Sequence, residues 1–185
     1  MTRLLAPLAA LLLVAGCDAN ESLLGEFEAR VDAGDGLRLV EGEAVYTVVD
    51  GPGGPEFVLG LFVGDLFESG YGEADYVLFR RPGRLPGVGA YAVDDDPTSA
   101  VAATIARVED AEEALGATGP VLHGRAGQLA LTSIDGYGFV VGTFRFDAVG
   151  FRVEAPGQTV VGGAAGRFEA RYEPPSTFAR IGLGV

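Results

Sequence analysis

Apolar and polar residues alternate in short runs along most of this chain. In GEFEARV, residues 25–31, Phe27, Ala29 and Val31 alternate with charged residues, which is typical of a strand with one buried face and one solvated face. Comparable runs occupy residues 37–49, 73–80, 121–134, 137–148 and 166–172. FVLGLFV, residues 57–63, is apolar on both faces and predicts a strand that is covered on each side.

Turn-forming residues separate these runs. Asp35-Gly36 predicts a type I′ turn, because both residue types tolerate the positive φ that this turn requires. Asp135-Gly136, between two alternating runs, is the strongest hairpin signal in the chain. The proline and glycine residues of DGPGGP, residues 50–55, predict a loop. About 8–10 short strands with close turns indicate an all-β fold, either an antiparallel β-sandwich or a small barrel.

Residues 97–115 allow two interpretations. A short helix would begin with Asp96 as its N-cap and Pro97 at its first position, and it would end at Gly116. A strand over AATIARV followed by an acidic loop fits the β-rich neighbours on both sides. Further on, Pro174 and Pro175 end the last regular strand, because proline cannot continue a hydrogen-bonded ladder.

The first 17 residues are typical of a secretory signal, with Arg3 followed by an apolar run that is too short to span a membrane as a helix. The segment Val14-Ala15-Gly16-Cys17 resembles the lipobox of bacterial lipoproteins, and Cys17 is the only cysteine. This resemblance implies cleavage before Cys17 and attachment of acyl chains to it, with two or more chains giving a stable membrane anchor. We therefore expect a location in the bacterial cell envelope, at the outer membrane rather than the inner one.

The expected organisation is a cleaved signal peptide at 1–16, a lipidated tether at 17–22, one β domain at 23–175 and a C-terminal tail at 176–185. The length of this domain suits a single hydrophobic core. The membrane is therefore the one partner that the sequence itself identifies, through the lipid on Cys17.

The mature chain also resembles a loose group of small bacterial all-β lipoproteins whose function is not known. Three strands share a pattern in which glycine, an aromatic residue and alanine recur on one face. They are Gly25-Phe27-Ala29, Gly142-Phe144-Phe146-Ala148 and Gly166-Phe168-Ala170-Tyr172, and Gly89-Tyr91 and Gly127-Leu129-Leu131-Thr132 extend the similarity. The resemblance implies an all-β secreted domain, and it supplies no catalytic motif.

Charge and composition exclude several classes of function. The formal net charge of −13 argues against nucleic acid as a partner, because phosphates require a basic surface. All 13 basic residues are arginine, so Schiff-base chemistry on lysine is excluded. His123 is the only histidine, and no nucleophile motif accompanies it.

Few residues are candidates for ion binding. Asp94, Asp95 and Asp96 are the candidates for a metal site, although they lack the spacing that wraps oxygen ligands around one Ca²⁺ ion. Arg80, Arg81 and Arg84 form the one basic cluster of the sequence. No cofactor is predicted.

An aromatic cluster supplies the candidates for ligand binding, which are Phe57, Phe62, Phe67, Tyr71 and Tyr76. The leading hypothesis is a membrane-anchored envelope lipoprotein whose β domain has a non-enzymatic binding or scaffolding role. The alternative is a lipocalin-like carrier that holds a small apolar ligand among these aromatic residues. A hydrolase that uses clustered carboxylates is a third hypothesis.

The two end strands carry nearly the same sequence, GEFEAR at residues 25–30 and GRFEAR at residues 166–171. Glycine, phenylalanine and alanine are the shared part, and they are shared with GTFRFDA as well. Because all three sequences share their apolar residues and differ in their polar ones, we interpret the copies as features of the fold and not as a duplicated binding site. We predict that the first and last strands lie in the same sheet.

Overall fold

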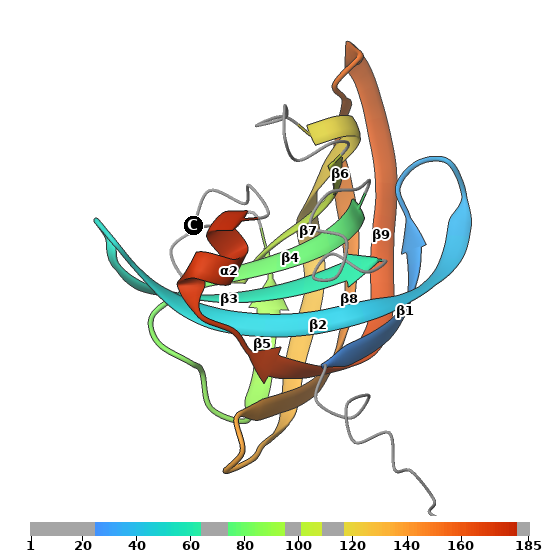
Figure 1. Cartoon of the computed structure of the whole chain (residues 1–185). Coiled ribbons are helices and arrows are strands. Elements are labelled where there is room, and N and C mark those ends of the chain that lie inside the picture. Colours follow the sequence, from blue (N-terminus) through green and yellow to red (C-terminus); the bar gives the residue numbers. More distant parts are fainter. Residues whose placement is uncertain (1–24, 64–73, 95–100, 109–116, 181–185) are drawn as a thin grey trace, which may run out of the picture.

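The computed structural model describes residues 25–63, 74–94, 101–108 and 117–180 (Figure 1). The described part consists of nine strands and one short helix. They are β1 (Glu26–Asp32), β2 (Leu37–Gly51), β3 (Gly54–Val63), β4 (Ala74–Pro82), β5 (Gly89–Val93), β6 (Ala102–Val108), β7 (Ala117–Ile134), β8 (Phe139–Arg152), β9 (Ala155–Tyr172) and α2 (Pro175–Arg180).

The described strands form one antiparallel sheet that closes into a ring, which corresponds to the barrel alternative of the predicted fold class. The order is β5-β7-β6-β4-β3-β2-β1-β9-β8, and a further pairing of β7 with β8 closes the ring. β5 pairs with residues 127–131 of β7, and β6 pairs with residues 117–123 of the same strand. These two short strands therefore lie on the same edge of β7. A short parallel contact between β2 and β9, beyond the start of β1, makes the ring irregular.

The two rims of the ring follow from this antiparallel order. One rim, here called the N-terminal rim, holds Gly25, where the described chain begins, and the connections at 52–53, 83–88 and 135–138. The backbone N–H of Gly83 donates to the carbonyl of Pro55, so two of these connections lie together. The other rim, called the opposite rim, holds the turns at 33–36 and 153–154.

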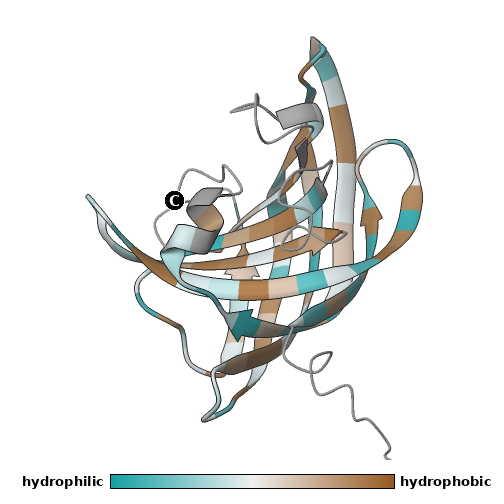
Figure 2. Ribbon diagram, in the orientation of Figure 1, coloured by the Kyte–Doolittle hydropathy of each residue, from teal (hydrophilic) through white to brown (hydrophobic). Residues whose placement is uncertain are grey.

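Side chains fill the interior of the ring. Hydrophobic and hydrophilic residues alternate along several strands (Figure 2), and every described strand contributes buried apolar residues to one interior cluster. The ring of Phe79 lies 5.3 Å from that of Phe144 and 5.6 Å from that of Phe146, measured between centroids. Phe168 is 6.4 Å from Phe144, so aromatic rings from three strands meet inside.

Glycines create the space that these rings occupy. Gly142 lies opposite Phe168 on β9, and Gly166 lies opposite Phe144 on β8. A Cβ atom at Gly142 would come within 2.6 Å of Cζ of Phe168 and closer still to the carbonyl oxygen of Ala130. The shared glycine-aromatic pattern of these strands is therefore a pairing of large and small residues across the ladder.

The predicted pairing of the first and last strands is confirmed. β1 and β9 are antiparallel neighbours, with Phe27 opposite Phe168 and Ala29 opposite Gly166. The two copies of the repeated sequence thus lie side by side in opposite directions. Their apolar residues enter the interior, whereas their charged residues share the outer surface.

A second apolar cluster lies outside the ring. Val45, Val58, Phe62 and Leu78 project outward from β2, β3 and β4, and Phe178 of α2 covers them. The Phe178 ring is edge-on to that of Phe62 at 6.3 Å. β3 is consequently buried on both faces, as its sequence predicted. The prediction of a simple tail from 176 onward misses this helix, which lies against the sheet in Figure 1.

The alternative of a short helix near 97–115 is wrong for residues 102–108. These residues form β6, which pairs with β4 along its full length. Val101 precedes β6 and donates its N–H to the carbonyl of Ala92, which joins β6 to β5. The remainder of 97–115 lies outside the described residues, apart from Val101.

The hairpin predicted at Asp135-Gly136 is confirmed, and β1 and β2 also form a hairpin. Both turns are four residues long, so the two-residue type I′ prediction at Asp35-Gly36 is wrong. An aspartate side chain organises each turn. Oδ1 of Asp32 accepts hydrogen bonds from the N–H groups of Gly34 and Gly36, at 2.8 and 3.3 Å. Oδ1 of Asp135 accepts from Tyr137 and Phe139 at 2.9 Å in both cases. An aspartate carboxylate thus organises each turn, and the glycines with positive φ in these turns are Gly34, Gly36 and Gly138.

Candidate functional site

The aromatic candidates for ligand binding do not form one wall. Phe57 faces the interior, whereas Phe62 and Tyr76 face outward beneath α2 with ring centroids 6.4 Å apart. Phe67 and Tyr71 lie outside the described residues. Burial raises the pKa of the Tyr76 hydroxyl. The sheet thus separates the described members of the cluster into two packed cores.

The candidates for metal binding are only partly placed. Asp94 is exposed directly after β5, and its N–H donates to the carbonyl of Val101 at 3.3 Å. Asp95 and Asp96 lie outside the described residues. Within the parts of the chain that the structure describes, no group of three or more His, Cys, Asp or Glu side chains is arranged to hold a metal ion.

The histidine and the three arginines of the basic cluster do not form a common site. His123 is exposed on the outer face of β7. Arg80 forms an ion pair with Glu56 at 3.1 Å, whereas the guanidinium of Arg81 lies 5.0 Å from the centre of the Tyr91 ring. Arg84 is exposed on the N-terminal rim. The basic cluster of the sequence is therefore divided among three environments.

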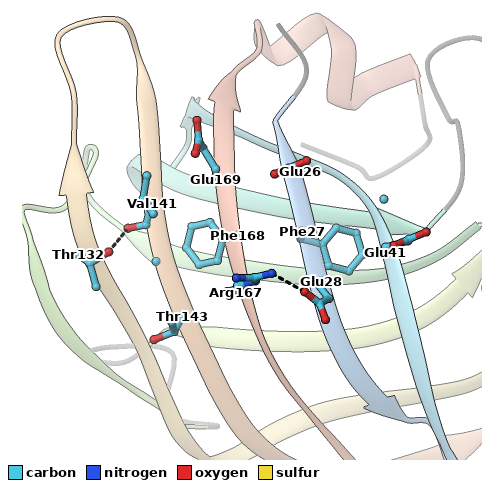
Figure 3. Close-up of a pocket in the computed structure, with 12 residues that line it drawn as sticks. Glu26, Phe27, Glu28, Glu41, Thr132, Val141, Thr143, Arg167, Phe168 and Glu169 are labelled. Atoms are coloured by element: carbon cyan, nitrogen blue, oxygen red, sulfur yellow. Dashed lines mark hydrogen bonds and ion pairs between the residues drawn. The ribbon is translucent and has the colours of Figure 1, made fainter. Parts of the chain in front are cut away.

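An open groove of about 660 Å³ lies on the outer face of the ring (Figure 3). It lies where β1 and β9 pair, and β2, β7 and β8 complete its walls. The lining residues are Glu26, Phe27, Glu28, Glu41, Gly42, Thr132, Val141, Gly142, Thr143, Arg167, Phe168 and Glu169. The charged halves of the two repeated sequences thus meet in this groove.

The groove is acidic, and its charges are arranged in rows across the strands. The guanidinium of Arg167 donates a hydrogen bond to the carboxylate of Glu28 at 2.7 Å, and a dashed line marks this ion pair in Figure 3. Glu26 lies directly opposite Glu169 on β9, and Glu28 lies opposite Glu41 on β2. Like charges in direct opposition destabilise a sheet, so these carboxylates reduce the stability of the strands that carry them.

The uncharged wall of the groove comes from β7 and β8. The hydroxyl of Thr132 donates to the carbonyl of Val141 at 3.1 Å, and Thr143 lies opposite Arg167. Gly42 and Gly142 carry no side chains, so the backbone forms part of the floor. The carboxylates, hydroxyls and backbone groups of this groove can bind a positively charged or hydrogen-bonding group of a partner.

Sequence reasoning treated the charged residues of the repeats as a solvated face and did not identify the groove. The available signal was the antiparallel pairing of two nearly identical strands, since in that arrangement each copy places its charges beside those of the other. Glu41 belongs to a third strand, and its position depends on the register of β2 against β1. No local pattern in the sequence encodes that register.

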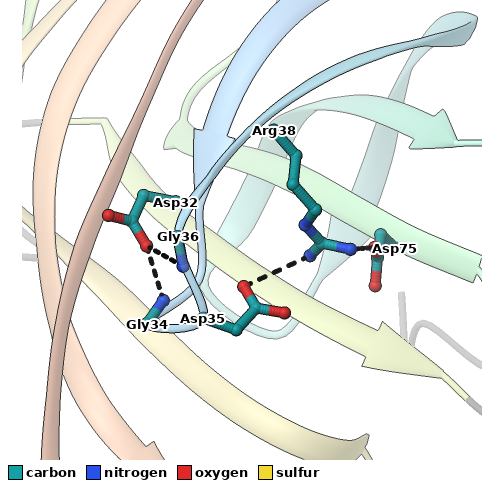
Figure 4. A network of polar contacts seen from close by, with 6 residues as sticks. All are labelled: Asp32, Gly34, Asp35, Gly36, Arg38 and Asp75. Carbon is teal, nitrogen blue, oxygen red and sulfur yellow. Dashed lines mark hydrogen bonds and ion pairs between the residues drawn. The ribbon is translucent and has the colours of Figure 1, made fainter.

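A second polar site lies inside the ring near the opposite rim (Figure 4). Arg38 forms an ion pair with Asp75 at 3.3 Å across the mouth and a longer one with Asp35 at 3.7 Å. The hollow beneath this pair has a volume of about 20 Å³, which is space for one water molecule. The ion pair covers this end of the described apolar interior.

Comparisons with known proteins give no family for this chain. No protein-family model, no curated protein and no solved structure matches it significantly. Among the described residues, no helix is both long enough and apolar enough to cross a membrane.

Proposed function

We propose that this chain is an envelope lipoprotein, anchored through acyl chains on Cys17, whose β domain binds a partner through the outer groove without catalysing a reaction. The lipobox supports the anchor. The groove supports the binding role and is the observation that carries it, because its opposed carboxylates cost stability at a place where neutral residues would serve the fold equally well.

The charge of the groove defines the class of partner. Four glutamates and one arginine line it, so a cationic segment of a protein or peptide is the complementary ligand. The outer membrane remains the proposed location, in line with the expectation from the sequence. The groove opens on the side wall of the ring, at the level where β1 starts.

A glycoside hydrolase also uses a pair of carboxylates, and Glu26 and Glu169 are such a pair by position. Both side chains are exposed on the sheet surface, however, whereas the general acid of such an enzyme works from a desolvated site. This difference favours binding over hydrolysis.

The carrier alternative requires an interior space of several hundred Å³. The aromatic rings of Phe79, Phe144, Phe146 and Phe168 occupy the centre of the described interior, and the hollow beneath Arg38 holds about 20 Å³. We therefore place the binding function on the outer face.

Native mass spectrometry of protein purified from membranes tests this choice. A carrier would retain one bound lipid per chain in addition to the acyl chains of the anchor.

The anchor is tested by mass spectrometry of the N-terminus of protein expressed in its own host. We expect the first residue to be Cys17 with diacylglyceryl and N-acyl groups, and we expect Cys17→Ala to leave the membrane fraction. An unmodified Cys17 would refute the proposed localisation.

The groove is tested by titrating an arginine-rich peptide against the full chain and two matched variants. The first variant combines Glu26→Gln, Glu41→Gln and Glu169→Gln. The control variant combines Asp50→Asn, Asp147→Asn and Glu154→Gln, which are exposed and lie outside the groove. Both remove three negative charges, so long-range attraction falls equally. We expect the first variant alone to lose most of the affinity, and equal losses in both would refute a specific groove.

A further inference from the structure

The rim from which the described chain begins also exposes an aromatic side chain at its tip. Tyr137, in the turn between β7 and β8, is 92% exposed and is the most exposed large hydrophobic residue described. The carboxylate of Asp135 is directed back to the N–H groups of that turn, which leaves the tyrosine projecting alone. Val88 in the neighbouring connection is 61% exposed.

These residues are of the types that favour a bilayer surface. Tyrosine is enriched at membrane interfaces, because its ring is apolar and its hydroxyl is wetted. Arg84, exposed in the same connection as Val88, offers a cation for lipid phosphate. Tyr172, at the end of β9, is 49% exposed and lies beside Gly138 of the turn.

The chain between Cys17 and Gly25 limits how far the start of β1 can lie from the lipid. Eight residues, 17–24, precede Gly25 and span at most about 26–29 Å when fully extended. The start of β1 lies level with Glu169, and Tyr172 lies three residues further, or roughly 10 Å closer to the rim. The Tyr137 turn is therefore within reach of a bilayer that holds Cys17.

Phe151, the exposed aromatic residue at the other end, is too distant for the same contact. Phe151 of β8 lies opposite Thr159, ten residues from Glu169 along β9, or roughly 33 Å. This distance exceeds the longest extension of the tether. The opposite rim consequently points away from the lipid whenever the N-terminal rim touches it.

We propose that the N-terminal rim, through Tyr137, Val88 and Arg84, rests on the lipid surface and holds the ring upright on the membrane. This inference rests on the proposed anchor at Cys17. Because the anchor makes the second contact intramolecular, a few weakly binding side chains suffice to orient the domain. The groove on the side wall then faces along the membrane.

The absence of tryptophan from the sequence allows a direct test. Tyr137→Trp and, as a matched control on the opposite rim, Phe151→Trp each introduce a single fluorophore at an exposed position. The full lipidated chains are reconstituted into phosphatidylcholine vesicles with some phosphatidylglycerol, with and without brominated acyl chains. Mass spectrometry of the same samples reports whether Cys17 carries its lipid.

We expect the tryptophan at 137 to shift its emission to the blue and to be quenched by the brominated lipid, while the tryptophan at 151 does neither. If the chain is lipidated and neither position is quenched, or both are quenched equally, the upright orientation is wrong and the anchor stands. A blue shift at 137 without quenching would indicate contact between protein copies and would also refute the membrane contact. Unlipidated Cys17 would instead refute the anchor and with it this inference.

Discussion

Replacing Gly142 with alanine tests whether the pairing of glycine with an aromatic ring fixes the interior. The added Cβ would lie 2.6 Å from the Phe168 ring and closer still to the carbonyl of Ala130. Neither neighbour is a flexible end, because the ring is enclosed and the carbonyl belongs to the ladder of β7. Overpacking of this kind costs about 1–3 kcal/mol of the free energy of unfolding.

Gly136 provides a matched control only six residues away. No atom lies within 4 Å of a Cβ built at Gly136, and its φ is outside the left-handed region. Gly136→Ala should therefore be neutral, or stabilising by about 0.4–1 kcal/mol, because it restricts the unfolded chain. The same substitution thus has opposite expected signs at the two positions.

Urea denaturation followed by far-UV circular dichroism measures both variants. For a chain of this size, each kcal/mol corresponds to roughly 2–4 °C in Tm, so thermal melting gives a second readout. In a double variant, Phe168→Leu should recover part of the loss caused by Gly142→Ala, since the smaller side chain vacates the contested space. If Gly142→Ala is as stable as Gly136→Ala, the large and small positions are not fixed against each other and the explanation of the repeated pattern is wrong.

Three further changes have defined outcomes. Phe178→Ala should lower the free energy of unfolding by about 3–5 kcal/mol, because this ring is completely buried, and the loss is measured by urea denaturation. Glu26→Gln should raise stability by about 0.2–1 kcal/mol in low salt by removing its repulsion with Glu169, and 1 M NaCl should abolish most of the gain. Burial, with Tyr172 and Asp135 nearby, raises the pKa of Tyr46 above that of an unfolded tyrosine. Its share of stability is therefore complete below about pH 10 and is lost at higher pH, so Tyr46→Phe should lose less stability than the wild type between pH 8 and pH 11.

Each of these changes has a result that contradicts it. Ser176→Ala lies on the exposed side of the same helix and should be close to neutral, so a loss equal to that of Phe178→Ala would mean that the helix itself was disturbed. A gain from Glu26→Gln that persists unchanged in 1 M NaCl would have a cause other than charge. Identical pH slopes for Tyr46→Phe and the wild type would show that this hydroxyl contributes nothing to the alkaline loss.

The strands could be predicted because a period of two is a local property of the sequence. In β1, β8 and β9, apolar residues occupy alternate positions, which predicts one buried face. The continuous apolar run of β3 predicts a strand that is buried on both faces. The segment at 102–108 was ambiguous, because its small apolar residues satisfy a helix and a strand equally. Pairing with β4 decided the outcome, and that pairing is not local.

The groove and the C-terminal helix escaped prediction for different physical reasons. The groove depends on the register of β1 against two strands, one of them at the other end of the chain. The helix Pro175–Arg180 is too short to be stable alone and exists because Phe178 fits over Phe62. In the turns, Asp135 was predicted correctly as a turn residue, but the side-chain hydrogen bonds of Asp32 and Asp135 were not anticipated.

The pairing of β1 with β9 has a consequence for how the chain folds. Arg167 and Glu28 are 139 residues apart in sequence, and their strands are neighbours in the ring. A chain synthesised from its N-terminus therefore provides β1 first and this partner last, and until then β1 has one open edge. Contacts of such large separation slow folding, so this edge is exposed to other chains until β9 pairs with it. Chains truncated before β9 would expose the same edge permanently and should aggregate.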